Sequence, residues 1–341
     1  MNRREFLKTA ALGGAALVSG MNVAKVFGAE TSTNPAATQP AAQQFANPFD
    51  APGQWYKANL HTHTTVSDGK LTPVQRVAQY RQAGYDVLLI TDHLLPKRYK
   101  GKLDMTGLND GKMLVISGME YHPHDQYPDS YHLLAINVPY PFTFSEPENP
   151  NQCIQEVAAA GGITWLGHPY WCGFQFDRVA PLKGLAAVEV YNYGCDVTSG
   201  SGVSDSEWSF MLNQGWHIPC MAVDDAHSAD GKDSFGGWTM LKMPALTTEN
   251  VITAITTGCC YASAGPQIKD FRIQDGEIKI VCPPAARIDF MGAPGKGRRL
   301  TAKNGNLLET AEAKPGPKMK FVRAIVTDAQ GRSAWTQPIW L

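Results

Sequence analysis

Short apolar runs alternate with helix-like segments through the middle of this chain, and this alternation constrains the fold more than any other feature. The strand-like runs are 57–60, 86–91, 113–117, 163–166, 187–191, 218–223 and 259–263. Helix-like segments lie between them at 73–83, 152–160, 206–213 and 248–257. The first begins with a strong local signal, because Thr72 can cap it, Pro73 takes the first helical position and Gln75 completes a capping box. Strands that alternate with helices predict a parallel sheet or an α/β barrel.

The pattern changes after Gly265-Pro266. Five short strand-like runs follow, separated by Gly, Pro and Asp-Gly turns, at 271–273, 277–281, 286–290, 321–327 and 334–340. Short strands with frequent turns predict a small antiparallel β-sandwich over residues 265–341.

The N-terminus carries an export pattern. Arg3-Arg4 precede Phe6 and Leu7, and a segment rich in Ala, Gly and Leu continues to about Val26. Twin arginines in this setting are typical of a twin-arginine export signal, and the glycine-containing segment is a poor membrane span. We expect residues 1–29 to be a cleaved signal peptide, the mature protein to be periplasmic or extracytoplasmic without a membrane span, and residues 30–54 to be a disordered linker.

Histidines and carboxylates stand where the apolar runs end. These candidate metal ligands are His61, His63, Asp68, His93, Glu120, His132, His168, Asp225 and His227. In an α/β barrel the carboxyl ends of the strands open onto one face, so residues that follow different strands meet there. His132 is the exception, because it stands within or just before an apolar run.

Nine candidate ligands are too many for one ion. Imidazole nitrogens and carboxylate oxygens bind zinc, manganese and iron, so the set predicts two or three clustered divalent ions. Two close ions lower the pKa of a bridging water and yield hydroxide at neutral pH, which is chemistry for hydrolysis. Each pattern alone is more often structural, and only their joint occurrence at strand ends supports a metal site. None of the seven cysteines falls within these patterns, so we expect no sulfur ligand.

Charge is divided unevenly along the chain. The net charge is −1, but residues 30–264 carry −10 and residues 265–341 carry +6. Divalent cations would offset the acidic charge of the ligand-bearing segment. The basic C-terminal segment predicts docking onto that segment or attraction of an anionic substrate, although a solvated surface explains it equally well. No basic run is interleaved with aromatic residues, so we expect no stable nucleic-acid complex. The oligomeric state stays open.

As a set, the motifs resemble those of the PHP (polymerase and histidinol phosphatase) metallohydrolases. The resemblance covers residues 55–264 and rests on Leu60-His-Thr-His63, Asp68-Gly69, Ile90-Thr-Asp-His93, Gly118-Met-Glu120, His132-Leu-Leu, His168-Pro and Asp225-Ala-His227. It implies a distorted (β/α)7-type barrel with a trinuclear site at its carboxyl face. It assigns His61, His63, Glu120 and Asp225 to one metal, Glu120, His132 and His168 to a second, and Asp68, His93 and His227 to a third. Some members have histidine at the position of Asp68, which leaves occupancy of the third site open. The export signal and β tail resemble the carbaryl-hydrolase-type branch.

The expected function is a phosphoesterase acting on small phosphomonoesters or phosphodiesters, with Glu120 and Asp225 positioning the hydroxide. A carboxylic ester, amide or carbamate hydrolase is the alternative, because the acidic segment supplies few cations for a phosphate. A non-catalytic metal-bearing binding module would be indicated by missing ligands, and none is missing. Lys97 and Arg98, after His93, and Asn192, at another strand end, are candidate substrate contacts. Asp92 and Asp224 are candidate hydrogen-bond partners of the ligand histidines.

Overall fold

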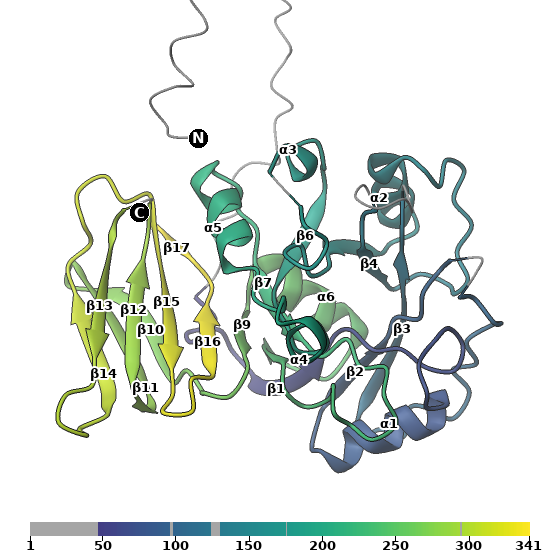
Figure 1. Cartoon of the computed structure of the whole chain (residues 1–341), viewed down its shortest axis with the longest axis horizontal. Helices are drawn as coiled ribbons and strands as arrows, with labels where there is room; N and C mark the ends of the chain where they lie inside the picture. The colour runs from purple at the N-terminus through teal and green to yellow at the C-terminus, as the bar shows by residue number, and fades with distance from the viewer. Residues whose placement is uncertain (1–46, 96–97, 124–129, 175, 294) are drawn as a thin grey trace, which may run out of the picture. The chain divides into compact units, whose positions relative to one another are not determined.

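The computed structural model describes residues 47–341, apart from 96–97, 124–129, 175 and 294 (Figure 1). The predicted signal peptide, residues 30–46 of the predicted linker and Lys97 lie outside the described residues. The rest of the predicted linker is placed: Phe49 packs on Trp55 and Tyr261, with ring centroids 5.4 and 6.2 Å apart. A search of the described part of the chain finds no helix with the length and hydropathy needed to cross a membrane.

Strands and helices alternate from residue 54 to residue 263, as the sequence predicts. The elements are β1 Gln54–Asn59, α1 Pro73–Gln82, β2 Val87–Ile90, β3 Leu114–Tyr121, β4 Leu133–Ile136, α2 Pro150–Ala159, β5 Ile163–Leu166, α3 Phe176–Val179, β6 Leu185–Asn192, α4 Tyr193–Ser199, α5 Asp205–Asn213, β7 Cys220–Val223, β8 Trp238–Met243, α6 Thr248–Thr257 and β9 Cys260–Ser263. The predicted capping box is formed at the start of α1: Gln75 N donates to Thr72 Oγ1 at 3.3 Å, and Thr72 N donates to Gln75 Oε1 at 2.9 Å. The sequence did not predict α3, α4 and β8.

The strand order places two parallel groups around one antiparallel strand. β1, β2 and β3 are parallel neighbours, and so are β5, β6 and β7. β4 lies between β3 and β5 and runs antiparallel to both, and β8 runs antiparallel to β1. The start of β4 therefore lies at the same edge of the sheet as the carboxyl ends of the parallel strands.

The strands enclose a common core. Residues that alternate along each strand from β1 to β7 pack with one another and with helix α6, among them Ala58, Leu89, Ile116, Leu134, Trp165, Ala187 and Met221. Residues of opposite orientation, such as Leu88 and Val188, pack with the outer helices α1, α2 and α5. Since one face of all seven strands shares a core, the architecture is a distorted α/β barrel, as expected.

Side chains complete this barrel where the strand ladder is interrupted. The hydrogen-bonded sheet ends at β7, which has no ladder partner on its second side. There the side-chain amide of Gln337 makes the hydrogen bonds that a neighbouring strand would make. Cys220 N donates to Gln337 Oε1 at 2.9 Å, and Gln337 Nε2 donates to Cys220 O at 2.8 Å. Thr239 Oγ1 accepts from Ala222 N at 3.1 Å and donates to Ala222 O at 2.9 Å. These contacts satisfy the backbone of a buried strand edge.

Backbone hydrogen bonds join the segments after the first and the last of these strands, beside the candidate ligands. Asp225 N donates to His61 O at 2.9 Å, and His63 N donates to Ala226 O at 3.0 Å. The segments that follow β1 and β7 are thereby joined, so ligands 164 positions apart in the sequence are fixed side by side.

Residues 265–341 form the expected antiparallel β-sandwich. Its strands are β10 Asp270–Gln274, β11 Glu277–Ala285, β12 Arg287–Met291, β13 Gly297–Thr301, β14 Leu308–Ala313, β15 Phe321–Thr327, β16 Ser333–Thr336 and β17 Ile339–Trp340. The sheet β10-β11-β14 packs on the sheet that contains β12, β13 and β15, with Phe271, Ile280, Ile288 and Phe290 in the core between them. β13 and β14 are polar and were not predicted.

The sandwich and the barrel share one sheet. β16 pairs with β9 in antiparallel register, so the large sheet continues from one into the other (Figure 1). Arg323 on β15 adds a buried contact: its guanidinium donates to both carboxylate oxygens of Asp205 on α5 at 2.8 and 2.9 Å. One bidentate ion pair thus joins the basic C-terminal segment to the acidic segment.

Candidate metal centre

The nine predicted ligands converge at the carboxyl face of the barrel. Their side chains come from the segments that follow β1, β2 and β7, from the end of β3, and from the segments on either side of the β4–β5 pair. His132 joins them because β4 is antiparallel, so the residue that precedes it lies where the other strands end. The orientation of β4 therefore explains the one ligand whose placement the strand-end pattern left open.

Four side chains meet at the first cluster. The Nε2 atoms of His61 and His63 lie 3.0 Å apart. Glu120 Oε2 lies 3.3 Å from each of them, and Asp225 Oδ1 lies 3.2 Å from His61 Nε2 and 3.0 Å from His63 Nε2. All four residues are buried. Two imidazole nitrogens and two carboxylate oxygens thus face one another at the spacing of groups that share a cation.

The second oxygen of Glu120 faces a different pair of histidines. Glu120 Oε1 lies 2.6 Å from His132 Nδ1 and 3.5 Å from His168 Nε2. Glu120 therefore presents one oxygen to each of two imidazole groups, which is the arrangement of a carboxylate that bridges two metal ions.

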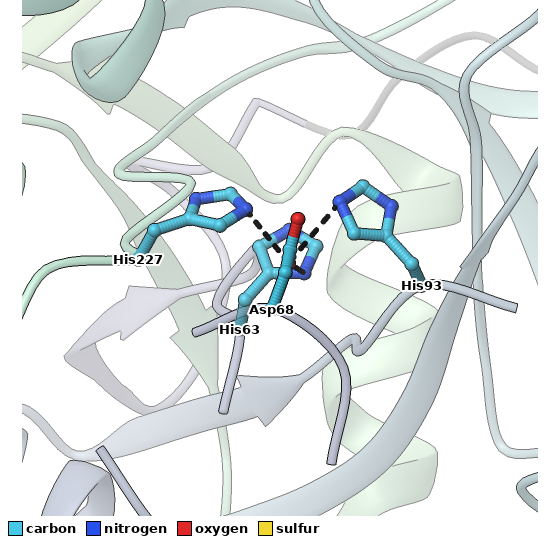
Figure 2. Close-up of side chains that lie close together, drawn as sticks. All are labelled: His63, Asp68, His93 and His227. Atoms are coloured by element: carbon cyan, nitrogen blue, oxygen red, sulfur yellow. Dashed lines mark ion pairs between the residues drawn. The ribbon is translucent and has the colours of Figure 1, made fainter. Parts of the chain in front are cut away.

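A third cluster surrounds Asp68. Its Oδ1 atom lies 3.3 Å from His227 Nε2, 3.5 Å from His93 Nε2 and 3.9 Å from His63 Nδ1. Figure 2 shows the Asp68 carboxylate between the rings of His227 and His93. The resemblance assigns His63 to the first metal alone, but in the structure its two nitrogens face two clusters. Asp68 and His227 are each about one-third exposed, so this cluster is the most open to solvent.

The donor set fits divalent cations. His63 Nδ1 and Asp225 Oδ1 are buried and lack a hydrogen-bond partner among the described residues, and such atoms cost about 1–3 kcal/mol each when nothing satisfies them. Asp225 also adopts a left-handed backbone conformation with φ of 54°, and strain of this kind concentrates at functional sites. Bound cations would satisfy these atoms, and the nine predicted ligands offer them nitrogen and oxygen donors.

Electrostatics in the cluster favour cations. Burial disfavours the charged form of His63, but the adjacent carboxylates of Asp225 and Glu120 outweigh burial and raise its pKa to about 9. Burial opposes ionisation of Glu120 and Asp225 as well, yet the surrounding histidines hold the pKa of both carboxyls well below the usual range. Burial lowers the pKa of His93 to about 4. In the metal-free site His63 is therefore protonated at neutral pH, because the surrounding carboxylates favour positive charge at this position.

Glu189, which the sequence analysis missed, holds two of the ligands in place. This fully buried carboxylate accepts from His61 Nδ1 at 2.9 Å and Trp165 Nε1 at 3.2 Å through Oε1. Its Oε2 accepts from His168 N at 3.0 Å and Asn192 Nδ2 at 3.1 Å. The bond to His61 Nδ1 leaves Nε2 as the ligand atom. The available signal was a single carboxylate inside an otherwise apolar strand, which a core tolerates only when it is hydrogen-bonded.

The two predicted partners of the ligand histidines have another role. Asp92 accepts from Thr64 and Ser67, which fixes the loop between His63 and Asp68. Asp224 accepts from Tyr80 Oη and from the backbone N–H groups of residues 235–237. Among the described contacts neither carboxylate bonds a ligand histidine, so both position backbone.

The candidate substrate contacts fall in different places. Arg98 lines a cavity of about 240 Å³ over the ligands and lies 3.3 Å from Asp68 Oδ2. Asn192 is fully buried and donates to Glu189 and to Asp225 Oδ2 at 3.2 Å, so it lies behind the ligands. Lys97 lies outside the described residues. For all three a contact with substrate stays a prediction.

Two further side chains, outside the nine predicted ligands, adjoin the site. His122 is buried, and its Nε2 lies 2.9 Å from His93 Nδ1. Cys172 Sγ lies 3.5 Å from His168 Nδ1, and burial raises the pKa of this thiol. A neutral thiol can donate to Nδ1 and leave His168 Nε2, which faces Glu120, free to bind metal.

No protein-family model matches the sequence, and a search of curated proteins gives no match. Solved structures are similar to the chain at low identity. A two-domain protein from Bacteroides vulgatus, described as containing a predicted PHP-like metal-dependent phosphoesterase, is 15% identical over 85% of this chain and 93% of that one, with a TM-score of 0.49. A lesion-specific endonuclease from Pyrococcus furiosus is 16% identical over 60% of this chain and 56% of that one, with a TM-score of 0.41. An amidohydrolase from Chromobacterium violaceum is 14% identical over 58% of this chain and 96% of that one, with a TM-score of 0.37. At these TM-scores we base no functional argument on the similarity.

Proposed function

We propose that this chain is a multinuclear metal-dependent hydrolase of the PHP type, acting as a phosphoesterase on small phosphomonoesters or phosphodiesters. The observation that carries the proposal is the position of Glu120, whose two carboxylate oxygens face two separate groups of imidazoles. A carboxylate in this position suits a pair of adjacent cations, and hydrolytic enzymes use such pairs.

The ligands would hold two to three divalent ions, of zinc, manganese or iron. Such ions acidify a water molecule at neutral pH and stabilise negative charge that develops on substrate oxygens. The chain's own residues fix the geometry. Glu120 and Asp225 supply the buried negative charge, Glu189 orients His61, and burial of the first cluster limits contact of its four ligands with bulk water.

Arg98 favours a phosphoester over a carboxylic ester. It is the only Lys or Arg among the described residues that line the cavity, and its guanidinium can donate to an anionic oxygen. Its ion pair with Asp68 occupies part of that capacity. A hydrolase of carboxylic esters, amides or carbamates therefore remains the second candidate. The small cavity suits a small-molecule substrate, and we propose no stable nucleic-acid complex.

The test combines two substrate panels with matched variants. Purified metal-loaded protein is assayed on phosphomonoesters and phosphodiesters beside carboxylic esters and carbamates. Glu120→Gln and Asp225→Asn should abolish turnover while circular dichroism shows a folded protein, and Asp68→Asn should reduce it less. Glu249→Gln, at an exposed position on α6, is the control and should have no effect.

Several outcomes contradict the proposal. Turnover of carbamates alone would transfer the assignment to the second candidate. Elemental analysis that finds one ion or none after reconstitution would remove the multinuclear site. Full metal loading without turnover on either panel would favour a non-catalytic metal-bearing module.

We also propose that residues 1–29 direct twin-arginine export, as in the carbaryl-hydrolase-type branch. Replacing Arg3 and Arg4 by lysine should leave the protein in the cytoplasm. Fractionation that still finds the double variant outside the inner membrane would rule out this route.

A further inference from the structure

We propose that Trp171 is a specificity-determining residue, which selects substrates whose group next to the scissile ester is flat and aromatic. This inference rests on the proposed hydrolytic function. Trp171 lines the cavity over the ligands and keeps 46% of its surface exposed. No other tryptophan in the described part of the chain is as exposed.

The ring of Trp171 is held at a defined angle to the ligand imidazoles. Its centroid lies 5.3 Å from that of His132 at an interplanar angle of 62°, and 5.2 Å from that of His168 at 85°. Edge-to-face contacts of this kind orient aromatic rings. Both histidines face Glu120 Oε1. The indole therefore lies directly beside the atoms that would hold the reacting group.

The backbone that carries Trp171 is fixed as well. Residues 168–174 form a turn in which Cys172 N donates to His168 O at 3.2 Å and Phe174 N donates to Pro169 O at 3.1 Å. Tyr170 N donates to Ser204 Oγ at 3.1 Å, which ties the turn to the start of α5. The exposed indole is therefore presented by an anchored turn, and a preorganised apolar surface binds with little loss of conformational entropy.

The other walls of the cavity leave room for a ring. Gly194, Cys195 and Thr198, on helix α4, are small and uncharged, and Arg98 supplies positive charge. One cavity thus combines ligands and a cation for an ester group with a flat apolar surface for its substituent. Aromatic pairs contribute roughly 0.5–1.5 kcal/mol beyond the apolar area that they bury, which corresponds to about 2- to 12-fold in kcat/KM.

The test uses substrates matched in size and in leaving alcohol. Benzyl phosphate is compared with cyclohexylmethyl phosphate, and the same two groups are compared as N-methylcarbamates. The native protein should prefer the benzyl ester by about 2- to 12-fold in kcat/KM in whichever series it hydrolyses. Trp171→Leu should remove the preference, and Trp171→Phe should retain part of it. Tyr170→Leu is the matched control, since Tyr170 is 51% exposed but does not line the cavity, and it should keep the full preference.

A role in packing alone gives a different result. Because Trp171 contacts His132 and His168, each variant's turnover is expressed per bound metal. If Trp171→Leu lowers kcat/KM equally on both members of a pair, or leaves the benzyl preference intact, the ring does not select the substrate.

Failure of the proposed function can be told apart from failure of this inference. Hydrolysis of the carbamates alone would refute the phosphoesterase assignment, and the benzyl preference would still be measured. If neither series is hydrolysed, calorimetry compares benzylphosphonate with cyclohexylmethylphosphonate on metal-loaded protein. Tighter benzylphosphonate binding that disappears in Trp171→Leu supports the aromatic wall, and equal binding of the two compounds overturns it.

Discussion

Replacing Glu189 by glutamine tests whether the candidate metal centre depends on a carboxylate outside the nine predicted ligands. Glu189 accepts four hydrogen bonds, two on each oxygen, from His61 and Trp165 and from His168 and Asn192. Glutamine has the same shape but only one accepting oxygen. In either orientation of the amide, two buried donors face an NH2 group and lose their acceptor.

The expected cost follows from these contacts. Each buried donor without a partner costs about 1–3 kcal/mol, so Glu189→Gln should lower the free energy of unfolding of the metal-free protein by about 2–6 kcal/mol. One of the two disturbed donors always belongs to a ligand residue, either His61 Nδ1 or the backbone N–H of His168. Loss of such a partner lowers metal affinity by about 10- to 100-fold.

Two measurements separate support of the metal from support of the fold. Urea denaturation of metal-free protein gives the stability, and competition with a chelator gives the metal affinity. Trp165→Phe is the control, because it removes one donor to the same carboxylate without touching a ligand. It should lower stability and leave metal affinity within a few-fold. If Glu189→Gln loses stability but keeps native metal affinity, the proposed orientation of His61 is refuted.

Three further outcomes follow from the structure. Metal binding at pH 7 should release protons, His63 contributing about one of them, because its pKa of about 9 keeps it protonated in the metal-free site. Despite burial, the carboxylates of Asp225, Glu189 and Glu120 also raise the pKa of His61 well above its usual range, so His61 should add to the release. His93, with a pKa of about 4, is already neutral and should release none. Affinity should therefore rise as pH increases toward 9, and calorimetry in buffers of different ionisation enthalpy that finds no proton release would contradict this. Gly69→Ala should lower the melting temperature and metal affinity together, because the added Cβ would lie 2.5 Å from the carbonyl carbon and oxygen of His63. An unchanged melting curve would show that the loop rearranges to accommodate the Cβ at no cost in stability. Gln337→Ala should cost about 2–6 kcal/mol in urea denaturation, since it strips the buried N–H and C=O of Cys220 of their partners, and a loss below about 0.5 kcal/mol would mean that β7 finds another partner.

Local signals were sufficient where one segment determines its own structure. Helix α6 was predicted over the residues that it occupies, and the capping box at Thr72 formed as expected, because both depend on neighbours in the sequence. The ligands were also predictable as a set, since each follows or adjoins a strand that the apolar runs reveal.

Features that depend on distant partners were not predictable. The direction of β4 comes from its pairing with β3 and β5, and only this direction explains how His132 reaches the site. The sequence shows Glu189 as one carboxylate in an apolar strand. The four groups that donate hydrogen bonds to this carboxylate come from separate segments, so the sequence pattern could not reveal them. Asn192 stands at a strand end as predicted, yet its burial behind Asp225 depends on the packing of α4.

The pairing of β9 with β16 has a consequence for the order in which the chain is made. Sixty-nine residues separate the end of β9 at Ser263 from the start of β16 at Ser333. During synthesis the barrel emerges first, with one edge of β9 unpaired until the later strand leaves the ribosome, and open strand edges invite pairing with other chains. A nascent or prematurely terminated chain that ends between these strands is thus exposed to aggregation even when every candidate metal ligand is already present, so a chaperone that shields this edge would act before the chain is complete.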